Sequence, residues 1–182
     1  MGAGIWKSLW QGILGGGTAT TRSIVEGESG SGGACGAGGT GAASAESRVA
    51  WKRLLPPDSF RVLFDEGTEP PHSHPLNREK GDGTFVCAAC HHPLFDSRQK
   101  YDSGTGWPSF HGALPDALGF KRDYLLVVPR TEYHCVACGG HQGHVFTDGP
   151  PPSGKRYCNN GLALKFIPRG EALPSRRDAG AH

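Results

Sequence analysis

The chain has 182 residues, a length that suits one domain with extensions. Its hydrophobic fraction is 36%, and its 29 Gly and 14 Pro favour turns and short strands over long helices. Lysine and arginine number 19 against 17 aspartates and glutamates, so the net charge is only +2. The Gly and Pro content therefore predicts a mainly β protein. Because nucleic-acid binding requires a clear basic excess, we expect no nucleic-acid partner.

Residues 1–46 differ in composition from the rest of the chain. Residues 5–14 are apolar and carry two tryptophans, no acidic residue precedes Glu26, and basic residues, serines and threonines follow, which is typical of an organelle transit peptide. The apolar run is too short to span a bilayer, so stable membrane insertion is not expected. From Gly27 to Gly41, eight of fifteen residues are Gly, which predicts a flexible linker.

The leader therefore has two open interpretations. As a transit peptide it would direct the protein to a mitochondrion or another organelle. As a disordered tail with an apolar patch it would leave the protein cytoplasmic.

Order is predicted to begin at Glu46. The apolar spacing of Glu46–Leu55 predicts a short amphipathic helix that is stopped by Pro56 and Pro57, and a second helical turn is expected after Asp58. Short apolar runs then alternate with Gly, Pro, Asp and His clusters, the pattern of antiparallel strands with long loops. These runs are Thr84–Val86, Tyr124–Val128, Tyr133–His134, Val145–Phe146 and Leu162–Ile167. The polar segment 169–182 is predicted to be a loose C-terminal tail.

Four of the six cysteines form two Cys-x-x-Cys knuckles, Cys87/Cys90 and Cys135/Cys138, separated by 44 residues (91–134). This spacing matches four thiolates around a tetrahedral zinc ion and predicts a structural four-cysteine zinc site. Such a cross-link would stabilise a small domain that has few apolar residues. Redox-active pairs or ordinary disulfides are the alternative.

The other two cysteines are Cys35, in the Gly-rich linker, and Cys158. A thiolate is the strongest side-chain nucleophile near neutral pH, so an unpaired Cys158 is a candidate for catalysis. Arg156 lies two residues away, on the same face if this segment is a strand, and would favour the thiolate form. An inert buried thiol is the alternative.

Several segments in order resemble the signature motifs of the methionine sulfoxide reductase B family. They are Gly67–Pro71, Lys100–Phe110, Gly143–Phe146 with Asp148–Pro150, and Arg156–Asn160. The resemblance runs from about Trp51 to Pro168 and implies a catalytic domain over 47–168. After the short N-terminal helices predicted from the apolar spacing, it implies two antiparallel sheets, with the active cysteine on a strand and the zinc site on the far side. The family reduces the R epimer of methionine sulfoxide in oxidised proteins, a repair reaction of oxidative stress.

The resemblance also implies roles for individual residues. Cys158 would attack the sulfoxide sulfur, release methionine and become a sulfenic acid. His141, His144, Asp148 and Asn160 match residues that line the family's active site. The two imidazoles and the carboxylate of Asp148, which would orient one of them, suit proton transfer, with His144 as the acid or the water-holding group. The alternatives are a role beside zinc or in packing for either histidine, and a turn role for Asn160.

A methyl sulfoxide requires an apolar wall for its methyl group. Trp107, between Gly106 and Pro108, matches the family's methyl-pocket tryptophan, and we place Phe146 and Arg156 beside it. The remaining histidines carry no such support and are treated as surface or loop residues: His72, His74, His91, His92 and His111.

Two departures from the family pattern matter. Thr105 stands where many members carry the cysteine that resolves the sulfenic acid, so the second thiol is either Cys35 or an external reductant such as thioredoxin. Within 112–129, a stretch that supplies another active-site histidine in many members differs here, so that role is not transferred.

Two further functions stay open at this point. A zinc-ribbon module that only binds partners would use both knuckles but would leave Trp107, His144 and Cys158 without a purpose. A thiol peroxidase would share the sulfenic acid but would need no methyl pocket. We expect a monomeric reductase whose partners are proteins bearing methionine-R-sulfoxide and a thiol reductant.

Overall fold

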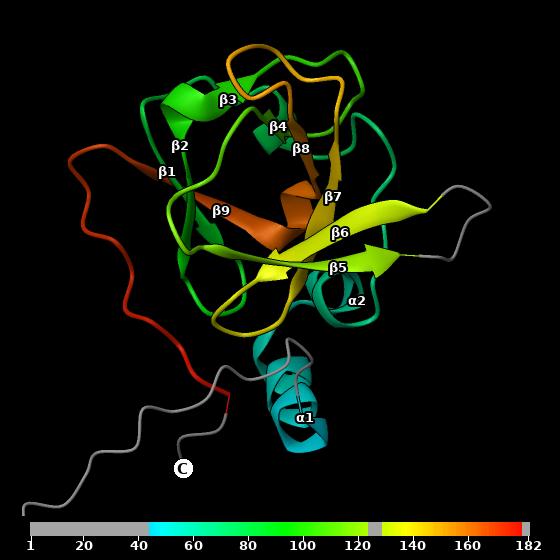
Figure 1. The fold of residues 1–182 in the computed structure, drawn as a ribbon. Coiled ribbons are helices and arrows are strands. Elements are labelled where there is room, and N and C mark those ends of the chain that lie inside the picture. Colours follow the sequence, from blue (N-terminus) through cyan, green and yellow to red (C-terminus); the bar gives the residue numbers. More distant parts are fainter. Residues whose placement is uncertain (1–43, 124–128, 180–182) are drawn as a thin grey trace, which may run out of the picture. The chain divides into compact units, whose positions relative to one another are not determined.

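The computed structural model describes residues 44–123 and 129–179. Residues 1–43 of the predicted leader, including Cys35, and the predicted strand Tyr124–Val128 lie outside the described residues. Within them, two α-helices precede a mainly β body of two antiparallel sheets (Figure 1), which confirms the predicted fold class. Neither α-helix in these ranges combines the length and the apolar run needed to cross a membrane.

The two helices form because each has a defined start and an apolar face. In α1 (Ala45–Leu54), the hydroxyl of the N-cap Ser44 accepts a hydrogen bond from the backbone N–H of Ser47. Helix α2 (Pro57–Phe64) begins at a proline, which is favoured at the first helical position because its missing N–H is not needed there. Trp51 stacks on Phe64 with ring centroids 5.9 Å apart, so the two helices pack on one another.

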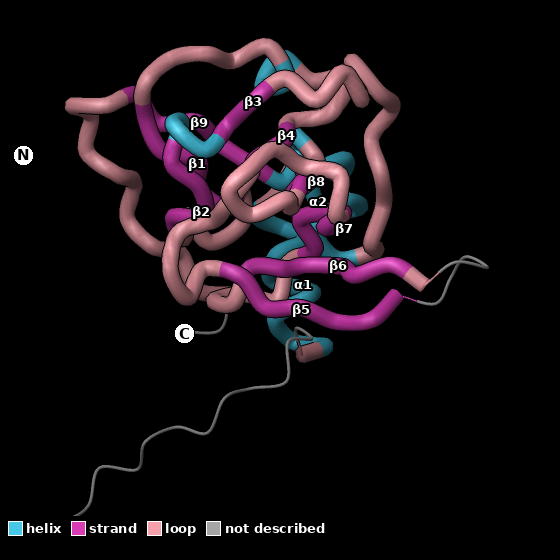
Figure 2. Tube along the Cα trace, turned by 45° about the horizontal axis from the view of Figure 1, so that its top comes forward, coloured by secondary structure: helices cyan, strands magenta, loops and turns pink. Residues whose placement is uncertain are grey.

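The strands divide into a three-stranded and a six-stranded sheet, with orders β2-β1-β9 and β3-β4-β8-β7-β6-β5. Their bounds are β1 Gly83–Cys87, β2 Pro93–Asp96, β3 Lys100–Tyr101, β4 Ser109–Phe110, β5 Leu118–Asp123, β6 Arg130–Cys135, β7 His141–Phe146, β8 Arg156–Asn159 and β9 Leu164–Pro168. Three 3-10 turns complete the described elements: η1 Pro75–Asn77, η2 Ser97–Gln99 and η3 Gly161–Ala163. Strands β5 and β6 run side by side over their whole lengths (Figures 1 and 2).

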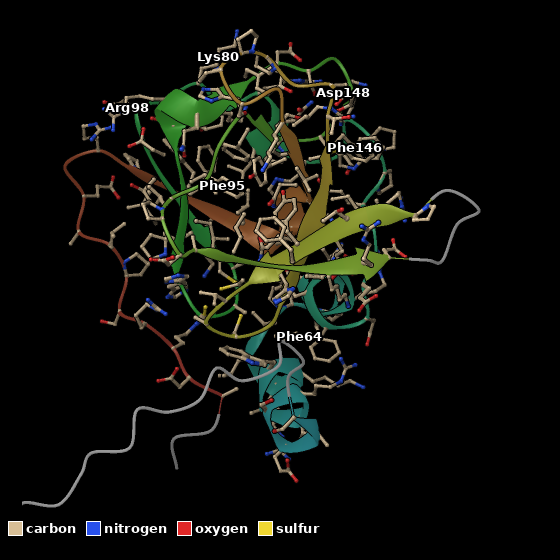
Figure 3. All side chains as sticks on the ribbon, viewed as in Figure 1. Phe64, Lys80, Phe95, Arg98, Phe146 and Asp148 are labelled. Carbon is tan, nitrogen blue, oxygen red and sulfur yellow. The ribbon has the colours of Figure 1, made fainter. Side chains whose placement is uncertain are left out.

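The core lies between the two sheets and is largely aromatic. Phe95 of β2, labelled in Figure 3, stacks on Phe110 of β4 with ring centroids 4.1 Å apart. Phe85 of β1 meets the edge of the same Phe110 ring, and Tyr133 of β6 lies edge-on to Phe95. All four side chains are inaccessible to solvent. These contacts hold one sheet against the other and fix the position of β8, which pairs with β4.

The C-terminal segment differs from its prediction. It contains no helix or strand beyond Pro168 within the described residues, but it is not loose at Arg177. The Arg177 guanidinium donates hydrogen bonds to the carbonyls of Ala89 (2.7 Å) and Ala88 (2.6 Å), and its backbone N–H donates to Cys90. The tail is therefore tied to the first cysteine knuckle, a long-range contact that its polar composition does not reveal.

Candidate functional site

The site is built on a row of residues that crosses the six-stranded sheet. Successive strand pairs place Glu132 opposite His144, His144 opposite Cys158, Cys158 opposite Ser109, and Ser109 opposite Tyr101. Directly opposed residues share a face of a sheet and have Cβ atoms about 4.5–5.5 Å apart. The thiol of Cys158 therefore lies between an imidazole on β7 and a hydroxyl on β4.

A pocket of about 140 Å³ opens beside this row. Its lining includes the predicted residues Cys158, His144, Asn160, Trp107 and Phe146. Thr68, Arg130, Gly143 and Asn159 complete the lining. The volume suits a methyl sulfoxide group on an extended side chain, and the wall is aromatic where the chemistry needs an apolar contact. His141, Asp148 and Arg156 do not line this pocket.

Cys158 is half-buried at the centre of the row. Burial raises the pKa of its thiol, while the guanidinium of Arg156 and the nearby hydroxyl of Thr105 lower it. Arg156 thus acts in the direction expected from the sequence, but burial outweighs it. The resting group at neutral pH is therefore the thiol.

His144 is held by a carboxylate that the sequence interpretation did not include. Its Nε2 lies 2.7 Å from Oδ2 of Asp123, and Arg130 donates a hydrogen bond of 2.8 Å to the same oxygen. Burial lowers the pKa of His144, although its hydrogen bond to Asp123 opposes the shift. The resting imidazole is therefore uncharged, with Nε2–H donating to Asp123 and the lone pair on Nδ1.

A β-bulge explains why His141 and His144 meet although they are three residues apart. The register between β6 and β7 shifts by one residue, which leaves Gln142 as the extra residue of β7. The two imidazole rings consequently lie edge to face with centroids 5.5 Å apart. His141 is buried behind His144, and its Nδ1 lies 2.9 Å from Oε1 of the buried Glu132, close enough for an ion pair but without the geometry of a hydrogen bond.

Asp148 does not orient either histidine, which corrects the pairing expected from the sequence. Its two carboxylate oxygens accept hydrogen bonds of 2.8 and 2.9 Å from the Arg156 guanidinium. That guanidinium lies over the Phe146 ring, 4.3 Å from its centroid. Phe146 and Asp148 come from the end of β7 and the loop after it (Figure 3). Asp148 and Arg156 therefore hold Phe146 and supply charge near the thiol without facing an imidazole.

Two positions at the site, one before Trp107 and one on β7, require glycine for reasons of backbone geometry. The residue before the tryptophan, Gly106, has φ +91°, a conformation that favours glycine. At Gly143, an added Cβ would lie 1.9 Å from the carbonyl oxygen of Cys158, so no side chain fits between β7 and β8 at this point. Both glycines are therefore required by the positions of Trp107 and Cys158.

The two cysteine knuckles form the hairpin turns of different sheets. Cys87 ends β1 before the turn to β2, and Cys135 ends β6 before the turn to β7. The four knuckle sulfurs lie within 4.8 Å of one another, with 3.7 Å between Cys87 and Cys138 and 3.6 Å between Cys90 and Cys135. Four thiolates around a metal ion at about 2.3 Å lie roughly 3.8 Å apart. The sulfur atoms thus have the spacing of a four-thiolate metal site.

Four residues of the site were missed by the sequence interpretation: Thr68, Asp123, Arg130 and Glu132. Thr68 lies inside the motif Gly67–Pro71, so its position in that motif is a signal from which its place in the site could have been predicted. The other three are brought to the two histidines by the pairing of β5, β6 and β7, which sequence spacing alone does not reveal.

Residues 55–168 match the SelR domain family. Three similar relatives are each named peptide methionine sulfoxide reductase MsrB. That of Pseudomonas fluorescens strain Pf-5 is 46% identical over 120 residues, which are 65% of this chain and 92% of the relative. That of Methanosarcina barkeri is 46% identical over 125 residues, which are 68% of this chain and 88% of the relative. That of Leptospira interrogans is 48% identical over 117 residues, which are 64% of this chain and 89% of the relative. With the whole β body inside the matched range, the chain belongs to the SelR domain family, that of the MsrB methionine sulfoxide reductases.

Proposed function

We propose that this chain is a peptide-methionine (R)-S-oxide reductase in which Cys158 is the nucleophile. The observation that carries the proposal is one pocket lined by a thiol, an imidazole and an indole, those of Cys158, His144 and Trp107. The thiol supplies the nucleophile, the imidazole can move a proton, and the indole can contact the substrate's methyl group. Membership of the SelR domain family supports this assignment.

The resting protonation states suggest how the proton moves. Cys158 is a thiol and His144 a neutral imidazole with its lone pair on Nδ1. On substrate binding, His144 takes the thiol proton, the sulfur of Cys158 attacks the sulfoxide sulfur, and the proton passes to the sulfoxide oxygen. The hydroxyl group then moves from the methionine sulfur to the Cys158 sulfur as the bond between the two sulfurs breaks, so methionine leaves and the cysteine becomes a sulfenic acid. Asn160 can hydrogen-bond the oxygen during this transfer.

His141 and the pair of Asp148 and Arg156 have indirect roles in this proposal. His141 packs on the ring of His144 and keeps it in place. Arg156 holds the Phe146 ring as part of the substrate wall and partly offsets the effect of burial on Cys158. Asp148 anchors Arg156 from the solvent side.

Regeneration needs two thiols. The sulfenic acid condenses with one thiol, releasing water, and a second thiol reduces the mixed disulfide. Because Thr105 occupies the position of the usual resolving cysteine, the first thiol comes from Cys35 or directly from thioredoxin or another external dithiol. Comparing Cys35→Ser with the unaltered chain, with thioredoxin as sole reductant, decides between them: an unchanged rate removes Cys35 from the mechanism.

We also propose that the four knuckle cysteines hold a structural zinc ion. The fit of their sulfur spacing to a tetrahedral thiolate site supports this. When bound, zinc cross-links the turns of two sheets and supplies no group to the reaction. The proposed organisation is a leader over 1–46, a catalytic domain over 47–168 and a tail over 169–182, and the biological role is repair of oxidised proteins.

The test is stereochemical. The R and S epimers of a peptide methionine sulfoxide are supplied with dithiothreitol, and reduction of the R epimer alone is expected, with none in Cys158→Ser. Hydrogen peroxide is supplied in parallel. Reduction of the S epimer, activity in Cys158→Ser, or turnover of peroxide without turnover of sulfoxide would each refute the proposal.

A further inference from the structure

Glu69 is a buried carboxylate for which the reaction described above has no use. It lies in the segment Gly67–Pro71 and is only 2% exposed. Its two carboxylate oxygens accept hydrogen bonds from the backbone N–H groups of Gly161 (2.7 Å) and Leu162 (2.8 Å). Hydrogen bonds to an ionised acceptor are roughly twice as strong as neutral ones, so the carboxylate firmly joins two segments far apart in the sequence.

The backbone of the same residue contacts two residues of the pocket. The carbonyl oxygen of Glu69 accepts a hydrogen bond of 3.0 Å from Nε1 of Trp107, and its N–H donates one of 3.1 Å to Oδ1 of Asn160. The neighbouring Thr68 itself lines the pocket. One residue therefore contacts both the indole of Trp107 and the amide side chain of Asn160, which line the same pocket.

We propose that Glu69 is a positioning residue that sets the distance between Trp107 and Asn160, and with it the width of the methyl pocket. The inference rests on the proposed function, since it treats Trp107 as the methyl wall. The carboxylate fixes the segment to the N–H groups after Asn160, and the backbone of that fixed segment then holds the indole and the amide. In glutamine one of the two oxygens is replaced by an NH2 group, so a side chain of the same shape places an acceptor opposite only one of the two N–H groups.

Substitution Glu69→Gln isolates this effect because it keeps the size of the side chain. Its amide nitrogen is a donor and would face one of the two N–H donors, so one hydrogen bond is lost and a buried N–H group is left unpaired. The segment then moves relative to Gly161, and the indole moves with it. Since one methylene in an apolar pocket changes kcat/KM by about 10-fold or more, a displaced wall should reduce discrimination against larger alkyl groups.

The experiment compares Glu69→Gln with the matched control Glu79→Gln. Glu79 also accepts a backbone hydrogen bond, from Gly81 at 2.6 Å, but it does not line the pocket. The first readout is kcat/KM for peptides bearing the R sulfoxides of methionine and of ethionine. The second is the Nε1–H resonance of Trp107, assigned with Trp107→Phe, which requires no activity.

In Glu69→Gln we expect methyl-over-ethyl discrimination to fall about tenfold and the Trp107 resonance to shift. Glu79→Gln should change neither. A folded Glu69→Gln protein with unchanged discrimination and an unchanged resonance would overturn the proposal, even if its melting temperature were lower. If Glu69→Gln does not fold, Glu69→Asp, which keeps the charge but draws it back by one methylene, is judged by the same two readouts. Inactivity of the unaltered chain would refute the proposed function, while the resonance would still test the role of Glu69.

Discussion

The Arg156→Gln substitution tests whether Arg156 supports both the substrate wall and the nucleophile. The Arg156 side chain is 10% exposed and makes two hydrogen bonds to Asp148, whose side chain is 61% exposed. Because Asp148 is largely in water, the ion pair contributes only about 1 kcal/mol to the free energy of unfolding. The contact with Phe146 at 4.3 Å adds about 1 kcal/mol. Their loss, about 2 kcal/mol, lowers the melting temperature by about 4–8 °C.

The same substitution should also raise the pKa of the Cys158 thiol. Arg156 is the main group that lowers the pKa of Cys158 against the effect of burial, so Arg156→Gln moves that pKa further above its ordinary value. The assay is the rate of alkylation of Cys158 by iodoacetamide as a function of pH, read by mass spectrometry of its peptide. The midpoint should move to higher pH, and alkylation at neutral pH should slow.

Arg98→Gln is the matched control. Arg98 makes the same two-point contact with Asp96, at 2.8 and 2.9 Å, but its side chain is 78% exposed, so the substitution should leave the melting temperature and the Cys158 midpoint unchanged. Equal losses of stability in the two variants, or a Cys158 midpoint that stays or falls in Arg156→Gln, would refute the reasoning.

Four other outcomes are expected. In Thr105→Cys, turnover without reductant should leave a disulfide to Cys158, because the Thr105 side chain already lies close enough to that thiol to lower its pKa; a dimedone-reactive sulfenic acid in this variant would contradict it. The acid limb of kcat/KM against pH should lie below pH 6.5, since His144 must be neutral to accept a proton and burial lowers its pKa. Asp123→Asn should move this acid limb to still lower pH, because the carboxylate of Asp123 raises the pKa of His144. An acid limb at higher pH in this variant would contradict that direction. Cys135→Ser should lose bound zinc by elemental analysis and melt at lower temperature, and a zinc-loaded, equally stable variant would exclude Cys135 as a ligand.

The helices and strands could be predicted to the extent that local pattern determines them. The predicted helix Glu46–Leu55 differs by one residue at each end from α1 (Ala45–Leu54). The second helix begins earlier and is longer than the predicted turn after Asp58, because Pro57 is the first residue of α2 and not a stop. The predicted run Leu162–Ile167 is split into a 3-10 turn and β9, and the strands β2 to β5 have too little apolar periodicity in the described residues to be recognised.

The site was predictable where chemistry follows from residue type and motif. Cys158, His144 and Trp107 line one pocket in the structure, although their roles are tested only by the experiments above. Asp123 and Glu132 could not be assigned to the histidines, because that depends on the register of β5, β6 and β7 and on the extra residue Gln142. Asp148 was assigned by closeness in sequence, and the fold brings it to Arg156 instead.

The place of β8 inside its sheet constrains how the enzyme is recycled. Strand β8 is hydrogen-bonded to β4 on one side and to β7 on the other, so it has no free edge, and Cys158 pairs with a neighbour on each side. Moving that backbone would break both ladders at once. In the proposed mechanism the oxidised sulfur of Cys158 therefore stays in place, and the incoming thiol has to move to it.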